Sequence, residues 1–327
     1  MASLAENISK VVNSNKSVTV KYFELVNDLQ LTHEDAANVL GISYRQMLAI
    51  RGRHNATSSA PTRQRAPRPH VPTLEERLAA YTFGVEIECK TRLSHYDLWR
   101  AFQEAQITSH DDFSHYNHTN SESSFKIMSD GSVHNTATRF GNEIVSPVLT
   151  NFETLQSVCK VLNTTADAKV DTECGLHVHI GAADLSDAAY INVFVNYAKL
   201  EAAIDKFMPQ SRRENIFCAS LRNINFANAT TKENTLQCFG RGEYRRDGRR
   251  YYRVNACAYH QHKTIEFRQH AGTTQFLKIK NWVNFCKKLV EFSKTTRLEN
   301  DITEIAAIPF LSDSEKRFFE HRAEQLA

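Results

Sequence analysis

The sequence predicts an α+β fold with a largely antiparallel sheet. Strand-like and helix-like segments follow one another without regular alternation, which is typical of α+β proteins. Two of the predicted strands, 251–258 and 263–268, are joined by a turn at Gln261 and His262, which indicates an antiparallel hairpin. Hydrophobic residues make up 41% of the 327 residues, enough for one large domain and a small one.

Residues 1–54 are predicted to form a small helical domain. Segment 18–29 has the pattern of an amphipathic helix. Thr32 is expected to cap a second helix that ends at Gly41, and Ser43 to cap a third helix over 44–51. Two helices joined by a glycine turn resemble a helix-turn-helix.

A basic linker is predicted over residues 55–72, where proline, serine and arginine dominate. From Ala36 to Leu74 there is no acidic residue, but there are six arginines: Arg45, Arg51, Arg53, Arg63, Arg65 and Arg68. Such a region fits contact with DNA or RNA phosphates. A docking or oligomerisation module followed by a solvated linker explains the same pattern.

Residues 73–327 are predicted to form the larger domain. Its expected strands are 83–88, 124–128, 142–145, 174–182, 251–258 and 263–268. Its expected helices are 74–81, 96–105, 152–162, a long helix from a cap at Asp184 or Ser186 to Phe207, 277–292 and 312–326.

Three of these strands carry pairs of polar residues two positions apart. The pairs are Glu86 with Glu88, His177 with His179, and Glu266 with Arg268. Side chains alternate between the two faces of a strand, so each strand has an apolar face and a face that carries its pair. Each polar face on its own could simply be in water. Glutamate is depleted in strands, however, which favours one shared site on a common sheet.

The residue types of that face suit metal and phosphate chemistry. Glu86, Glu88 and the strand residue Glu143 are hard oxygen ligands for Mg²⁺ or Mn²⁺. Glu266 can hold a metal while Arg268 clamps a phosphoryl group. Asp130 lies in a DGS segment and is expected mainly to form a turn.

Further candidates lie around these strands. Arg253 and Asn255 are expected on one face of their strand, beside an arginine-rich loop that contains Arg241, Arg245, Arg246, Arg249 and Arg250. That loop either closes over anionic groups or is a soluble hairpin tip. The histidine-rich loop with His110, Asp111, Asp112, His115 and His118 is expected to be solvated.

The composition bears on where the protein is located in the cell and on which partners it contacts. The seven cysteines form no C-x-x-C motif, which favours reduced thiols in the cytoplasm. No apolar run reaches the length of a membrane span, and the first residues lack the apolar core of a signal peptide, so no membrane contact is expected. The net charge of +3 does not make the whole chain a nucleic-acid binder.

Six short motifs, in their order along residues 82–292, resemble the motif set of the amidoligases, carboxylate–amine ligases related in fold to glutamine synthetase and glutamate–cysteine ligase. They are Phe83-Gly-Val-Glu-Ile-Glu88, Asp130-Gly-Ser132, Glu143-Ile-Val-Ser-Pro147, Cys174-Gly-Leu-His-Val-His-Ile-Gly181, Tyr252-Arg-Val-Asn255 and Thr264-Ile-Glu-Phe-Arg268 with Ala271-Gly-Thr273.

The resemblance implies a curved, half-barrel sheet with helices on one side and an ATP-dependent ligase that acts on a carboxylate and an amine. Position by position it implies four metal ligands: Glu86, Glu88, Glu143 and Glu266. It implies ATP with Mg²⁺, or Mn²⁺ in its place, as the cofactors. The substrates could be free or borne by a peptide, protein or nucleic acid.

The same resemblance implies roles for the other polar residues. His177 or His179 is a further ligand or phosphate contact. The chemistry of amide formation also requires a group that accepts the amine proton, and a site carboxylate or His179 could do so. Arg268 stabilises the transferred phosphoryl group, and Arg253 and Asn255 hold nucleotide or substrate. Two other functions stay open: a zinc hydrolase that uses His177 and His179, and a nucleic-acid-binding regulator whose C-terminal domain senses a ligand.

Overall fold

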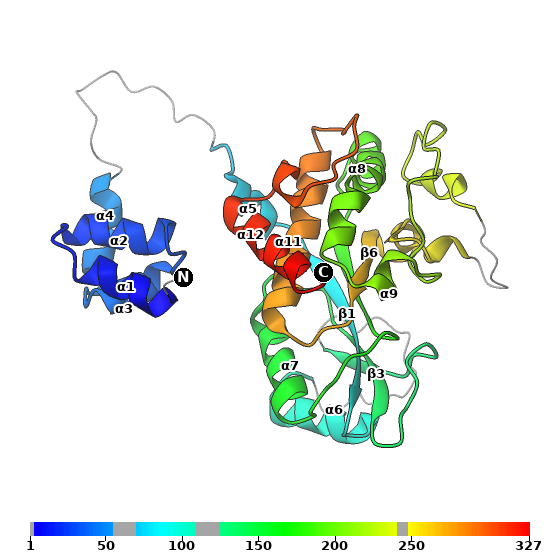
Figure 1. Ribbon diagram of the computed structural model, residues 1–327, viewed down its shortest axis with the longest axis horizontal. Helices are drawn as coiled ribbons and strands as arrows, with labels where there is room; N and C mark the ends of the chain where they lie inside the picture. Colours follow the sequence, from blue (N-terminus) through cyan, green and yellow to red (C-terminus); the bar gives the residue numbers. More distant parts are fainter. Residues whose placement is uncertain (1–2, 55–69, 109–123, 241–247) are drawn as a thin grey trace. The chain divides into compact units, whose positions relative to one another are not determined.

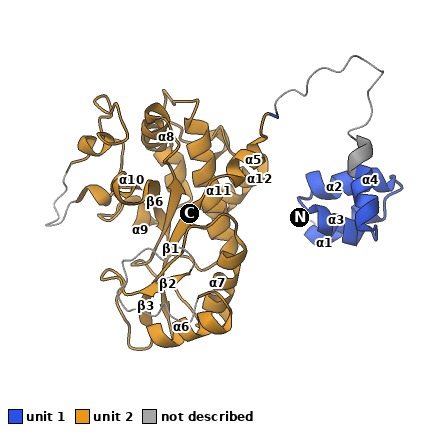
Figure 2. Ribbon diagram, turned by 180° about the vertical axis from the view of Figure 1, so that it is seen from behind, with its two compact units in different colours: residues 1–70 blue, residues 71–327 orange. Residues whose placement is uncertain are grey.

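The computed structural model describes residues 3–54, 70–108, 124–240 and 248–327 (Figure 1). The chain divides into two compact units, Met1–His70 and Val71–Ala327 (Figure 2). The histidine-rich loop 110–118 and arginines 241, 245 and 246 lie outside the described residues, so their expected roles stay predictions.

The first unit consists of short helices around its own core. They are α1 Leu4–Val12, α2 Val18–Asn27, α3 His33–Val39 and α4 Tyr44–His54. The expected caps are present. The Thr32 side chain accepts a hydrogen bond from the N–H of Asp35, and the Ser43 side chain accepts one from the N–H of Gln46. The core side chains are Tyr22, Leu25, Ala36, Ala37, Met47 and Ile50.

The second unit is built on one six-stranded sheet. Its strands are β1 Phe83–Thr91, β2 Lys126–Met128, β3 Phe140–Val145, β4 Gly175–Gly181, β5 Val254–Asn255 and β6 Thr264–Ala271. The strand order is β2-β3-β1-β4-β6-β5, and every neighbouring pair is antiparallel. The predicted α+β fold with an antiparallel sheet is therefore confirmed. Its likeness to glutamine synthetase stays a prediction.

Helices cover the apolar face of the sheet. They include α5 Leu74–Ala79, α6 His95–Glu104, α7 Glu153–Thr164, α8 Asp187–Lys206, α11 Phe276–Ser293 and α12 Asp313–Glu324. The buried residues of α6, α7, α8, α11 and α12 join those of the strands in one hydrophobic core, and the partly buried Leu78 of α5 packs against it. Tyr197 of α8, for example, lies 5.9 Å, centroid to centroid, from Phe267 of β6. In the described residues, no helix is both long and apolar enough to cross a membrane.

Shorter helical segments complete this unit. They are α9 Gln210–Arg213, α10 Cys257–His262, and the 3-10 turns Thr235–Cys238, Gly248–Arg250 and Ile305–Ala307. Of the two candidate caps of α8, Ser186 is the one whose side chain accepts from a helix N–H, that of Ala189.

The predicted hairpin is wrong in its first strand. β5 is only two residues long, and α10 replaces the end of the expected strand and its turn. The reason lies in Asn255, whose side-chain Oδ1 accepts the N–H of Cys257 at 2.8 Å and so bends the backbone into a turn. Ala258 and Tyr259 of α10 are buried, which holds that helix in place.

Lys287 is a buried lysine in the core beneath this sheet. Only 4% of the residue is exposed, and its Nζ lies 4.4 Å from the ring centroid of Phe83. Burial lowers the pKa of Lys287 to about 8. Its cation–π contact offsets only part of the cost of leaving water.

We expect Lys287→Met to stabilise the fold by about 2 kcal/mol at pH 7. Below pH 8 the lysine is charged in both states, whereas between pH 8 and 10.5 the unfolded chain binds more protons than the folded one. The stability of the wild type should therefore rise with pH across this window, relative to the variant. Urea unfolding at several pH values measures both effects. Lys280→Met, an exposed change on the same helix, should show neither.

Candidate active site

The register of the sheet brings the predicted polar residues onto one face. Glu88 of β1 pairs with Glu143 of β3, and Glu86 of β1 pairs with His177 of β4. His179 of β4 pairs in turn with Glu266 of β6, whose other neighbour is Asn255 of β5. Residues from five parts of the sequence thus form one polar cluster, which we call the sheet cluster: Glu86, Glu88, Glu143, His177, His179, Asn255, Glu266 and Arg268.

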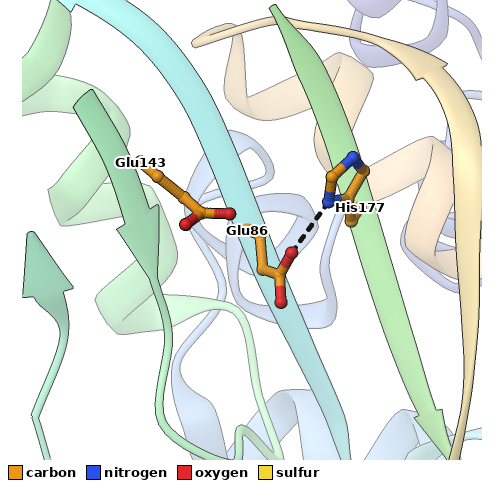
Figure 3. A group of neighbouring side chains, drawn as sticks. All are labelled: Glu86, Glu143 and His177. Atoms are coloured by element: carbon orange, nitrogen blue, oxygen red, sulfur yellow. Dashed lines mark hydrogen bonds and ion pairs between the residues drawn. The ribbon is translucent and has the colours of Figure 1, made fainter. Parts of the chain in front are cut away.

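Glu86 is the centre of the sheet cluster. Its two carboxylate oxygens bond to different histidines, with Oε2 2.7 Å from His177 Nδ1 and Oε1 3.2 Å from His179 Nε2. Glu143 lies on the other side of Glu86 (Figure 3). Burial opposes ionisation of Glu86, but the hydrogen bonds with His177 and His179 outweigh it and hold its pKa well below the usual value.

Glu266 and Arg268 form an ion pair in the same cluster. Arg268 Nη1 contacts Glu266 Oε1, and Asn255 Nδ2 donates to Glu266 Oε2 at 2.5 Å. Glu266 is only 4% exposed and Arg268 only 6%. Burial opposes ionisation of Glu266, but the charge of Arg268 outweighs burial and lowers the pKa of Glu266. The carboxylate and the guanidinium are therefore both held in their ionised forms. Likewise, bonding to Glu86 and the charge of Glu266 outweigh burial and raise the pKa of His179.

A second group of carboxylates lies toward β2. Oxygen atoms of Glu88, Asp130 and Glu143 all lie within 4.8 Å of one another. Burial, followed by the negative charges of Glu86, Asp130 and Glu88, raises the pKa of Glu143 well above its usual value. Asp130 also forms the expected turn, since its Oδ1 accepts the N–H of Ser132 at 2.6 Å.

A β-bulge lies at Arg268 in β6. Phe267 pairs with Val178 and His270 pairs with Leu176, so two residues of β6 lie opposite the single residue His177. Arg268 faces the polar side, as Glu266 does, and Gln269 faces α8, where its Oε1 accepts from the Tyr197 hydroxyl at 2.7 Å.

Arg212, which the sequence analysis missed, supports that bulge. It belongs to the four-residue helix α9 and is only 3% exposed. Its guanidinium donates to both bulge carbonyls, with Nε 3.3 Å from the oxygen of Gln269 and Nη2 bonded to that of Arg268. We therefore describe Arg212 as a positioning residue. A helix of one turn has no periodic pattern that could have revealed it.

A cavity of about 400 Å³ opens beside the sheet cluster. Glu86, His179, Asn255 and Glu266 form part of its wall. The rest comes from Leu236, Arg250 and residues of α10, among them His262, whose ring centroid lies 6.1 Å from that of His179. Charged residues of the sheet thus border a space large enough for a small-molecule substrate.

A family comparison agrees with this geometry. Residues 79–290, more than half of the chain, match the family model described as "Putative amidoligase enzyme". The chain belongs to this amidoligase family. The matched segment contains every residue of the sheet cluster, and the suspected resemblance is confirmed. A search of curated proteins found no match.

Not every candidate residue of this amidoligase lies in the sheet cluster. Arg253 Nη1 lies 3.2 Å from Glu201 Oε2 and 2.9 Å from Asp205 Oδ1, both on α8. The guanidinium is thus engaged by carboxylates of the helical layer, and the predicted contact of Arg253 with nucleotide or substrate stays a prediction. Of the arginine-rich loop, Arg250 does line the cavity.

Three groups of ligand atoms in the described residues could hold a metal ion. They are Glu86 with Glu143 and His177, Glu86 with His179 and Glu266, and Glu88 with Asp130 and Glu143. Carboxylate oxygens dominate in all three, which favours Mg²⁺ or Mn²⁺ over zinc. Within the described parts of the chain, no such group combines His177 with His179.

Proposed function

We propose that this amidoligase is an ATP-dependent carboxylate–amine ligase. A carboxylate and an amine do not condense in water unless the carboxylate first acquires a leaving group. Attack of the carboxylate on the γ-phosphate of ATP supplies one, giving an acyl phosphate and ADP. The amine then displaces phosphate and loses a proton. The observation that carries this proposal is the buried Glu266–Arg268 pair, whose carboxylate lines one cavity together with that of Glu86.

The donor set fits Mg²⁺. Glu88, Asp130 and Glu143 would hold one ion through oxygen atoms alone, and Glu86 with Glu266 would hold a second. Burial, followed by the charges of neighbouring carboxylates, raises the pKa of Glu143, and a divalent cation would offset the repulsion between those charges. When bound, Mg²⁺ would neutralise phosphate oxygens of ATP.

Residues of the chain itself would orient the reacting groups and stabilise their charge. Arg268 would stabilise charge on the migrating phosphoryl group, because a buried guanidinium acts in a medium of low dielectric. Glu266, which accepts a hydrogen bond from the Asn255 amide, keeps Arg268 in place. The raised pKa of His179 favours its protonated form, so we assign it to binding anionic oxygen and assign proton acceptance to a carboxylate.

The test is ADP release from ATP and Mg²⁺ in the presence of pooled carboxylates and amines, with mass spectrometry for a new amide. Substrate-dependent ADP release together with a condensed product supports the ligase. Absence of ATP binding would overturn it. Bound zinc in the purified protein, with hydrolysis that needs no ATP, would support the zinc hydrolase instead.

A further inference from the structure

The helices α3 and α4 of the first unit are joined by a short turn and share one core. The chain turns at Gly41, whose φ of +64° is a conformation that glycine adopts without strain. The N–H of Ile42 reaches back to the carbonyl of Ala37 at 3.0 Å, which closes the end of α3. Ala37 of α3 and Met47 and Ile50 of α4 are buried in the same small core, so the angle between the two helices is fixed by packing.

The outer face of α4 is not covered by this unit. Tyr44 is 72% exposed and Leu48 is 46% exposed, and they lie one turn apart. Arg45 and Ala49 form a second exposed pair with the same spacing. Gln46 is exposed as well, and its Oε1 accepts from the backbone N–H of Ser43 at 2.8 Å, which anchors the first turn.

Acidic and basic residues of this unit are concentrated in different parts of its sequence. All acidic residues of the first unit precede Ala36, and they are Glu6, Glu24, Asp28, Glu34 and Asp35. From Ala36 to Leu74 the chain has only basic charges, and α4 itself contains three arginines: Arg45, Arg51 and Arg53. Tyr44, Arg45 and Leu48 of α4 are exposed, and a helix with no acidic residue complements a polyanion.

We propose that α4 binds duplex DNA by entering its major groove, with Arg45 contacting a phosphate or a base edge and Tyr44 beside it. The major groove of B-form DNA admits an α-helix. The corresponding groove of A-form RNA is too narrow and deep, which favours DNA over double-stranded RNA. This activity is independent of the proposed ligase, because the first unit lies outside the family match at residues 79–290.

The test uses the full chain and a fluorescein-labelled DNA duplex of random sequence, about 30 base pairs long, followed by fluorescence anisotropy. Wild-type protein should bind with an affinity that falls steeply between about 50 and 200 mM salt. Arg45→Glu should weaken binding at least about 10-fold and reduce the salt slope. The variant should fold normally, because an acidic residue suits the first turn of a helix.

The matched control is Lys10→Glu, which makes the same charge change at an exposed position of α1. The fold-loss of DNA affinity in Lys10→Glu should be less than a third of the fold-loss in Arg45→Glu. Equal losses in both variants would overturn the assignment to α4. Tighter binding of a single-stranded or hairpin RNA probe would also overturn the proposal, as would no DNA binding at low salt. Self-association that Leu48→Glu abolishes, without DNA binding, would identify the face as a protein interface instead.

Discussion

Replacing Glu266 with glutamine should lower substrate-dependent ADP release by about 10²- to 10³-fold. Glutamine has the size of glutamate but no charge, so the variant keeps the shape of the cavity wall. It loses the ion pair that holds Arg268 and one of the carboxylates that could bind a metal ion. Both losses act on phosphoryl transfer, so turnover should fall in the presence of saturating ATP. The measurement is steady-state ADP release with the substrates that the pooled screen identifies.

The control for Glu266→Gln is Glu299→Gln, the same change at an exposed position. It should leave turnover within about two-fold of wild type, as surface changes usually do. Loss of the carboxylate charge removes the ion-pair partner of the buried Arg268, which costs about 3–5 kcal/mol of stability. Circular dichroism should therefore confirm that the variant is folded at the assay temperature. A folded Glu266→Gln protein with wild-type turnover would contradict the role assigned to the pair.

The strands of the site could be predicted because their side chains alternate. Glu86 and Glu88, for example, are separated by Ile87, which is fully buried. Alternation places residues on a face, but it does not say which strands are neighbours. That Glu88 meets Glu143 and that His179 meets Glu266 depends on the register, which only the folded sheet fixes.

Other parts of the site could not be predicted, because they depend on departures from regular structure. Arg253 and Asn255 were expected to point to the same side, as alternate residues of a strand do. β5 begins only at Val254, however, and the buried carboxylate of Glu201 draws the Arg253 guanidinium toward α8. The bulge at Arg268 and its support by Arg212 likewise need contacts between residues far apart in the sequence.

The carboxylate group toward β2 leads to the second prediction. Mn²⁺, used as a spectroscopic substitute for Mg²⁺, should bind to the wild-type protein, and Glu143→Gln should weaken the site that contains Glu88 and Asp130 by at least about 10-fold. Titration followed by electron paramagnetic resonance measures free Mn²⁺ directly, so the result does not require a known substrate. Glu104→Gln, an exposed change on α6, should bind as wild type does.

The same variant should behave differently when no cation is present. Glu143 is half-buried beside three other carboxylates, and partial burial together with their charges disfavours its ionised form. Glutamine removes that cost, so Glu143→Gln should be as stable as wild type, or more stable by about 1 kcal/mol, in chelator-treated samples. Urea unfolding with and without Mn²⁺ then separates the two effects. A variant that is destabilised without cation yet binds Mn²⁺ normally would make Glu143 a structural residue rather than a ligand.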